Sequence, residues 1–240
     1  MMQQRAPVSG IRVLFLTENE RKRGVVSDFI VNSLFMRNQS FSPRRIWRWL
    51  LRFRHRCGYG IQSPFAFSFV TGVVYERGMY YAYDPLSREA RRNRSPLREK
   101  DDRLLLRLAN ASRATWMLVA GPVDSLSLSY LQAGRRCFCK EVRDVSVRTL
   151  EKALQGREAP GLVYAAPGTV LDDVVRTVLP HAGDRTMLVL AGIYASQASR
   201  EAWRRLKADS RVRVTFDLYD FGIAFFQQRL NKQNYIVNYF

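Results

Sequence analysis

Short apolar runs alternate with amphipathic segments from about residue 101 to residue 207. Within each amphipathic segment, apolar residues recur three and four positions apart, as they do along one face of a helix. The expected order is helix 102–110, strand 115–120, helix 123–133, strand 136–141, helix 145–155, strand 162–165, helix 170–179, strand 186–190 and helix 197–207. Apolar strands that alternate with helices predict an α/β fold, with a doubly wound, mostly parallel sheet covered on both faces.

The chain ends in a different pattern. Val212–Leu218 and Ile223–Gln227 both read as strands, and only residues 219–222 lie between them. So short a connection cannot hold a crossover helix, so the two strands are expected to pair antiparallel. Tyr235–Tyr239 is a candidate for one more strand at this edge.

The first hundred residues predict a helical appendage. Pro43–Arg56 has apolar residues on one side at helical spacing, and Ser63 followed by Pro64 is typical of a helix start. Arg88–Lys100 is interpreted as a linker or an exposed helix. The predicted organisation is an N-terminal extension of uncertain order at 1–35, a basic aromatic appendage at 36–100 and an α/β domain at 101–240. A further hypothesis is that the native chain starts at Met36.

Composition adds a strong positive charge. Lys and Arg exceed Asp and Glu by 39 − 21 = 18, so the surface should attract phosphates or anionic lipid. Three cysteines and two histidines offer no zinc-ligand spacing, which predicts free thiols in a reducing compartment. No apolar run reaches membrane-spanning length and no signal-peptide pattern begins the chain, so a cytoplasmic location is expected.

Two segments resemble class I S-adenosylmethionine-dependent methyltransferases. His55–Tyr83, HRCGYGIQSPFAFSFVTGVVYERGMYYAY, is similar to the N-terminal section of a bacterial subgroup of this family. Arg200–Phe226, REAWRRLKADSRVRVTFDLYDFGIAFF, resembles that subgroup's closing helix and hairpin. The resemblance implies a Rossmann-like sheet that ends in an antiparallel strand pair, S-adenosylmethionine as the cofactor, and methyl transfer to an unknown acceptor.

The cofactor motifs depart from the family pattern. The family has a Gly-rich turn after its first strand, because the cofactor approaches a main chain without Cβ atoms. Here that turn holds Ala120 and Gly121, which would contact the cofactor, and Pro122 follows them. Glu141 matches the acidic residue that binds the ribose hydroxyls, although pairing with the nearby Arg143 would explain it equally well.

The expected catalytic positions lack acidic groups. Ala166 and Pro167 follow one strand where the family commonly has Asp-Gly, and Leu190–Ile193 ends the next strand without a carboxylate. No general base and no metal ligand can be assigned at either place. No catalytic residue is therefore named.

The chain is also short for the family. About twenty residues separate Glu141 from Leu162, which is enough for one helix but not for the helix, strand and helix of the family fold. The third strand and its helix are expected to be missing, which removes a wall of the adenine pocket. The alternative is that the strand at Leu162 is itself the third strand in a shifted register.

Several other residues have structural interpretations. Trp116 and Trp203 belong to apolar faces and are expected in the core. Cys137 and Cys139 point to the same face of a strand and are interpreted as packing groups. An acidic pair, Asp172 and Asp173, opens a helix, where negative charge favours the helix dipole.

The basic appendage leaves the function open. Its arginines are Arg44, Arg45, Arg48, Arg52 and Arg54, and they could form a solvated face, contact nucleic acid, or dock on a membrane surface with Trp47 and Trp49. Two hypotheses follow. The chain is either a methyltransferase or a non-catalytic descendant that binds RNA, an anionic membrane surface or a protein through its basic surface.

Overall fold

The computed structural model describes residues 50, 52, 60–93 and 97–239. The described part before the sheet is helical. It holds α3 (Pro64–Phe69), a short π-helix η3 (Val70–Val74), α4 (Tyr83–Asn93) and α5 (Glu99–Ser112). The predicted start of α3 is confirmed, because the Ser63 side chain accepts a hydrogen bond from the Ala66 N–H and Pro64 opens the helix. Most of the predicted helix at Pro43–Arg56 lies outside the described residues.

The alternation predicted from the sequence is present with nearly the expected boundaries. Its elements are β1 (Trp116–Ala120), α6 (Ser125–Gly134), β2 (Phe138–Val142), α7 (Val147–Leu154), β3 (Leu162–Ala165), α8 (Leu171–Val178), η4 (Leu179–His181), β4 (Met187–Ala191), α9 (Gln197–Ala208), β5 (Val214–Asp217), β6 (Phe221–Phe225) and β7 (Gln233–Ile236). Short buried strands and amphipathic helices therefore follow one another as the apolar pattern predicted.

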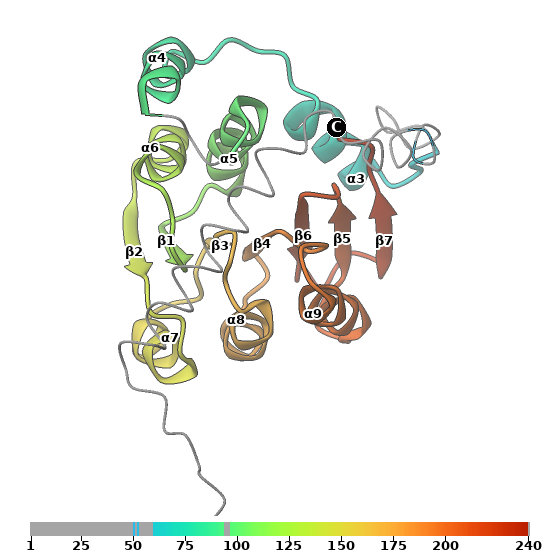
Figure 1. Cartoon of the computed structure of the whole chain (residues 1–240). Helices are drawn as coiled ribbons and strands as arrows, with labels where there is room; N and C mark the ends of the chain where they lie inside the picture. The colour runs from blue at the N-terminus through green and yellow to red at the C-terminus, as the bar shows by residue number, and fades with distance from the viewer. Residues whose placement is uncertain (1–49, 51, 53–59, 94–96, 240) are drawn as a thin grey trace, which may run out of the picture.

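The seven strands form a single sheet in the order β2-β1-β3-β4-β6-β5-β7 (Figure 1). β6 is antiparallel to both of its neighbours, β4 and β5, and the other pairs are parallel. The antiparallel pairing predicted for the closing strands is therefore confirmed. The candidate strand near the C-terminus forms at Gln233–Ile236, two to three residues earlier than expected, and pairs with β5.

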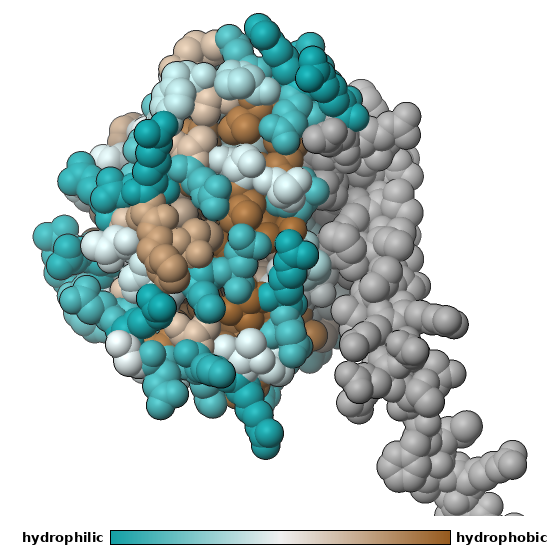
Figure 2. Space-filling model, turned by 90° about the vertical axis from the view of Figure 1, so that its left-hand side faces the viewer, coloured by the Kyte–Doolittle hydropathy of each residue, from teal (hydrophilic) through white to brown (hydrophobic). Residues whose placement is uncertain are grey.

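One strand-helix unit is absent between β2 and β3. β2 pairs only with β1 among the described strands, and α7 is the single helix between β2 and β3. β2 is therefore an edge strand, whose unpaired side would lie against a third strand if the sheet had one. Figure 2 looks at this side of the molecule, where brown apolar residues lie between teal hydrophilic ones.

Helices cover the sheet on both faces (Figure 1). The first core joins α3, η3, α5 and α6 to one face, through residues such as Leu105, Leu131 and Phe216. The second core joins α7, α8 and α9 to the opposite face and includes Trp116 and Trp203, as expected for both tryptophans. Two buried layers on one sheet fix the positions of the strand ends, where ligands of α/β proteins bind.

Candidate functional site

The turn after β1 contains two of the predicted cofactor-binding residues. Ala120 is fully buried and Gly121 adopts a left-handed backbone with φ of 96°. The Gly121 N–H donates to the Val142 carbonyl at 2.8 Å, which joins this turn to the end of β2. Ala120 and Gly121 thus lie at the carboxyl edge of the sheet beside the junction between β1 and β3.

Glu141, the predicted ribose-binding residue, lies on the neighbouring strand. It is in register with Val119, and Val142, the residue after it, bonds to Gly121. Its side chain is about one-third exposed, and a carboxylate oxygen lies 4.0 Å from an Arg143 nitrogen, at the limit of an ion pair. The three predicted residues are therefore close together, and a ribose-binding role for Glu141 remains a prediction.

The space against Gly121 is occupied by Thr169. The Thr169 hydroxyl donates to the Ala120 carbonyl at 3.3 Å, and a Cβ built on Gly121 would lie 1.9 Å from the Thr169 Oγ1. The Ala166 N–H donates to the same Ala120 carbonyl, which continues the parallel pairing of β1 with β3 by one residue. The chain reverses its strand order between β1 and β3, and ligands of doubly wound sheets bind at such a junction. Any side chain at position 121 would therefore clash with Thr169, so this turn requires glycine.

The ends of β3 and β4 have only backbone roles. Ala166 and Ala191 are buried and have no polar side-chain atoms. The Gly192 N–H donates to the Asp220 carbonyl at 2.7 Å, which ties the end of β4 to the turn between β5 and β6. Neither position therefore has a side chain that could act as a general base.

A carboxylate that the sequence reasoning did not single out lies at the end of β5. The Asp217 side chain is 6% exposed and accepts hydrogen bonds from the Tyr194 hydroxyl and the Tyr219 N–H. Arg52 donates to the same carboxylate at 2.9 Å. Its guanidinium lies over the stacked rings of Tyr194 and Tyr219, 5.7 and 5.5 Å from their centres. The Asp-Leu-Tyr-Asp run at the end of an apolar segment was the available signal for this cluster.

Arg52 was one of five appendage arginines predicted to bind an anionic partner. In the structure it forms an ion pair with Asp217, and its side chain is 14% exposed. A guanidinium held by a buried carboxylate and two tyrosines has little capacity left for a phosphate. The other four predicted arginines lie outside the described residues, so their role stays a prediction.

The environment of the Tyr194 hydroxyl makes the free energy of unfolding depend on pH in the alkaline range. Burial raises its pKa to about 12, and the neighbouring Asp217 carboxylate adds to this increase. The folded state therefore keeps a proton that the unfolded chain loses near its ordinary value of 10.0. The stabilisation is present below pH 10 and is lost as the pH rises toward 12.

This loss can be measured by urea denaturation at several alkaline pH values. We expect the free energy of unfolding of the wild type to fall between pH 10 and pH 12, and to fall less in Tyr194→Phe, which has no hydroxyl to titrate. Equal slopes for the two proteins would contradict the assignment to Tyr194.

A second buried polar cluster joins α5 to the turn between β5 and β6. Arg98 donates to both oxygens of Asp101, at 2.6 and 2.9 Å, and also to Asp220. Burial raises the pKa of Asp101, against the opposing effect of the Arg98 charge. Asp102, the next residue, accepts from the Ser127 hydroxyl at 2.7 Å. These contacts hold the start of α5 against the closing strands and against α6.

The remaining predicted residues have structural surroundings. Burial raises the pKa of both Cys137 and Cys139, the latter to about 11, so both remain thiols rather than reactive thiolates at neutral pH. Asp172 opens α8 as expected, and it also pairs with Arg176 and Arg205 at 2.8 and 2.6 Å. Among the described residues, no group of His, Cys, Asp and Glu side chains could hold a metal ion, and no helix there is long and apolar enough to cross a bilayer.

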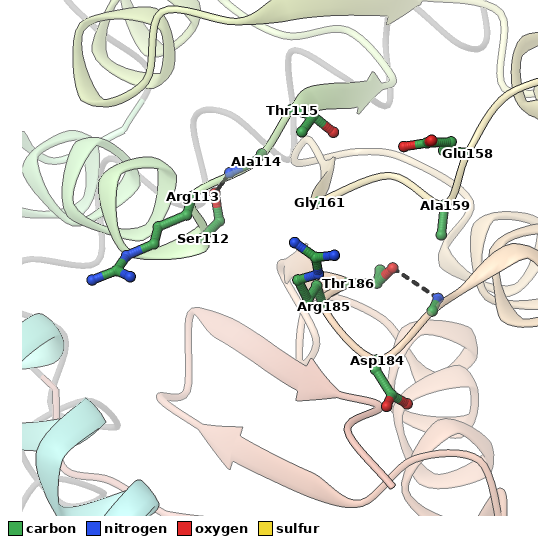
Figure 3. Close-up of a pocket in the computed structure, with 11 residues that line it drawn as sticks. Ser112, Arg113, Ala114, Thr115, Glu158, Ala159, Gly161, Asp184, Arg185 and Thr186 are labelled. Atoms are coloured by element: carbon green, nitrogen blue, oxygen red, sulfur yellow. Dashed lines mark hydrogen bonds between the residues drawn. The ribbon is translucent and has the colours of Figure 1, made fainter.

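A pocket of about 350 Å³ lies at the opposite, amino edge of the sheet (Figure 3). Its wall includes Thr115, Gly161 and Thr186, each of which directly precedes a strand. In Figure 3 the Arg185 guanidinium projects into the space between the labelled residues, and the Asp184 carboxylate projects away from it. This pocket was not predicted from the sequence, because its wall is formed by three loops that are distant along the chain.

Comparisons with known proteins give matches among solved structures only. No protein-family model and no curated protein matches the sequence. Solved structures that match include the O-methyltransferase TomG from Streptomyces achromogenes, involved in tomaymycin synthesis and solved with S-adenosylmethionine, at 15% identity and a TM-score of 0.44 over 62% of this chain and 91% of that chain. An O-methyltransferase from Bacillus cereus, in complex with S-adenosylhomocysteine, matches at 12% identity and a TM-score of 0.47 over 66% of this chain and 96% of that chain.

A third match is the methyltransferase PaMTH1 from Podospora anserina, bound to S-adenosylhomocysteine, at 12% identity and a TM-score of 0.46 over 91% of this chain and 99% of that chain. At such identities these likenesses concern the fold alone. The sheet with its antiparallel closing strands is the arrangement that the sequence resemblance implied, and the missing unit after β2 was predicted separately from chain length. The chain has a Rossmann-like, methyltransferase-like fold.

Proposed function

We propose that this chain is a non-catalytic protein with a methyltransferase-like fold that binds RNA. The observation that carries the proposal is the contact of Thr169 with Gly121, which fills the place where a cofactor would approach the end of β1. The absence of carboxylates at the ends of β3 and β4 supports it. A fold outlasts its chemistry because core packing and catalysis depend on different residues.

The basic residues favour RNA as the partner. Of 39 basic residues, six are lysine, so 39 − 6 = 33 are arginine. Arginine binds phosphate through two parallel hydrogen bonds and stacks on aromatic rings and bases, whereas lysine acts as a point charge. A surface rich in arginine with accessible aromatic rings is suited to single-stranded nucleic acid.

RNA binding can be tested by fluorescence anisotropy with a labelled single-stranded RNA of mixed sequence. We expect affinity to fall steeply with salt, since each phosphate contact contributes about −0.7 to the slope of log K against log salt concentration. Co-sedimentation with vesicles of phosphatidylserine and phosphatidylcholine is the parallel measurement. Binding to the vesicles without binding to RNA would overturn the proposal in favour of a membrane role.

The second candidate function is S-adenosylmethionine-dependent methyl transfer. The positive φ of Gly121 and the nearness of Glu141 favour it, and structures of similar fold were solved with S-adenosylmethionine or S-adenosylhomocysteine bound. Direct displacement depends mainly on positioning donor and acceptor, so it does not require a strong base. This candidate requires Thr169 to leave its place against Gly121.

Isothermal titration with S-adenosylmethionine separates the two candidates. We expect no heat of binding from the wild type at millimolar ligand, and the same from Thr169→Val, which keeps the volume of the side chain. Thr169→Gly removes that volume and is expected to give a measurable heat of binding at millimolar ligand, where the wild type and Thr169→Val give none. Micromolar binding by the wild type would overturn the non-catalytic assignment.

A further inference from the structure

The amino edge of the sheet combines an open pocket, a group of arginines and an accessible aromatic ring. We infer that this edge is the RNA-binding surface and that its pocket receives one unstacked nucleotide. The inference rests on the proposed function and names its site. For reference, the amino-edge arginines are defined as Arg113, Arg135, Arg136, Arg157 and Arg185.

Contacts connect four of these arginines to the pocket, and Arg136 follows one of them, Arg135, directly in the chain. Arg113 and Arg185 belong to its wall. The Arg135 Nε donates to the carbonyl of Ala114, another wall residue, at 3.0 Å. The Arg157 guanidinium lies 5.7 Å from the ring of Trp116, at the start of β1, and the Trp116 Nε1 donates to the carbonyl of Glu158 in the wall.

The local charge at this edge is positive. The five amino-edge arginines are all exposed, and the acidic residues of the pocket wall are Glu158 and Asp184. Within the pocket wall two basic residues, Arg113 and Arg185, balance two acidic ones, Glu158 and Asp184, and the positive excess comes from the arginines beside the wall. Such an excess attracts the phosphates of a nucleic acid strand and orients it along the edge.

Phe138 supplies an aromatic surface beside the arginines. Its side chain is 50% exposed, although phenylalanine is usually buried in a domain of this size. The Arg157 guanidinium lies over its ring at 4.7 Å from the centre. Phe138 also lies on β2, which pairs on one side only among the strands that the structure describes. An exposed ring next to a guanidinium is the arrangement on which bases stack in single-strand binding proteins.

The pocket has suitable size and chemistry for one nucleotide. Its volume of about 350 Å³ lies within the range of small-ligand sites. Arg185 projects into it and can bind a phosphate, while the hydroxyl of Thr115 and the carboxylate of Glu158 can bind polar groups of a base (Figure 3). Gly161 lets its loop pack directly against Ala114 in the wall, because a Cβ there would lie 2.5 Å from the Ala114 Cα.

Arg113 adds an independent observation. It ends α5 in a left-handed conformation, with φ of 48°, at the position after a helix where glycine is most common. A side chain in that conformation is strained, and such strain gathers at functional sites. If Arg113 serves RNA binding, replacing it with glycine should stabilise the protein and weaken RNA binding at the same time. If Arg113 had only a structural role, Arg113→Gly would change stability without weakening RNA binding.

The experiment compares variants of the full chain in the anisotropy assay with single-stranded RNA. Arg157→Ala/Arg185→Ala is expected to weaken binding about tenfold. It should also reduce the magnitude of the slope of log K against log salt concentration by about 1.4, which corresponds to two lost phosphate contacts. Phe138→Ala is expected to weaken binding about tenfold through lost stacking, with little change in salt dependence. Arg113→Gly should raise the midpoint of thermal unfolding and weaken binding several-fold.

The matched control is Arg200→Ala/Arg204→Ala, which removes two exposed arginines from α9. It should bind RNA as the wild type does. If the wild type binds RNA and the control loses as much affinity as the amino-edge variants, the surface assignment is overturned while the proposed function stands. If the wild type does not bind RNA, both fail together. Circular dichroism verifies that every variant is folded.

Photochemical crosslinking gives a second readout that needs no variant. Wild-type protein irradiated with RNA containing 4-thiouridine should yield crosslinked peptides from residues 112–116, 136–140 and 157–161. Crosslinks confined to other parts of the chain would overturn the inference even if RNA binds tightly.

Discussion

Asp217→Ala is expected to lower the free energy of unfolding by about 3 kcal/mol, because it leaves a largely buried guanidinium without its carboxylate. The Asp217 and Arg52 side chains are 6% and 14% exposed, so solvent would compensate Arg52 only in part. The same substitution removes the acceptor of the Tyr194 hydroxyl and of the Tyr219 N–H. Urea denaturation followed by far-ultraviolet circular dichroism measures the loss.

Two further variants identify the origin of this effect. Asp217→Asn keeps an oxygen that can accept a hydrogen bond from Tyr194, so its free energy of unfolding should fall less than that of Asp217→Ala. Arg52→Ala leaves the Asp217 carboxylate with two hydrogen bonds, so its free energy of unfolding should also fall less than that of Asp217→Ala. A double-mutant cycle between Arg52 and Asp217 should give a coupling of about 1 kcal/mol or more, as expected for groups in contact. A coupling near zero would mean that the ion pair does not hold Arg52 on the sheet.

This ion pair bears on the two candidate functions. Asp217 lies at the carboxyl edge, where a methyl acceptor would have to approach. It is occupied by a guanidinium from the same chain, and the nearby space against Gly121 is occupied by Thr169. Both contacts lie at the edge at which ligands of doubly wound sheets bind. The pocket lined by Arg113 and Arg185 lies at the other edge.

The sequence predicted the fold well because its signals are local. β3 forms at Leu162–Ala165, with the bounds expected from a four-residue apolar run. The missing strand-helix unit was also predictable, since chain length between Glu141 and Leu162 limits what can be built there. The alternative, a strand at Leu162 in the third position, is excluded because β3 pairs with β1 and β4.

The candidate site was less predictable because it depends on contacts between distant residues. Ala120 and Gly121 could be recognised as the turn after the first strand, but nothing in that turn indicates that Thr169 lies against it. The pairing of Arg52 with Asp217 joins residues 165 positions apart. Such contacts follow from the packing of the whole sheet and have no local pattern.

Trp203 packs one large buried side chain against the closing strand β6. Trp203 is 1% exposed on α9, and Gly222 of β6 approaches it so closely that a Cβ there would lie 2.8 Å from the Trp203 ring. We expect Trp203→Ala to lower the free energy of unfolding by about 4 kcal/mol through lost burial and the cavity that remains.

The indole Nε1 of Trp203 has no hydrogen-bond partner among the described residues, so the predicted loss should come from packing rather than from a broken polar contact. Trp203→Phe, which keeps part of the ring volume, should therefore recover more than half of the loss, and the exposed neighbour Arg204→Ala should change stability by less than about 0.5 kcal/mol. Urea denaturation followed by circular dichroism measures all three, because it does not depend on the fluorescence of the removed tryptophan. A loss below 1 kcal/mol in Trp203→Ala would show that the reversed strand β6 is held by other contacts. The antiparallel pair is the feature by which the fold is recognised, so its stability decides whether the sheet can persist as a scaffold after its cofactor motifs have changed.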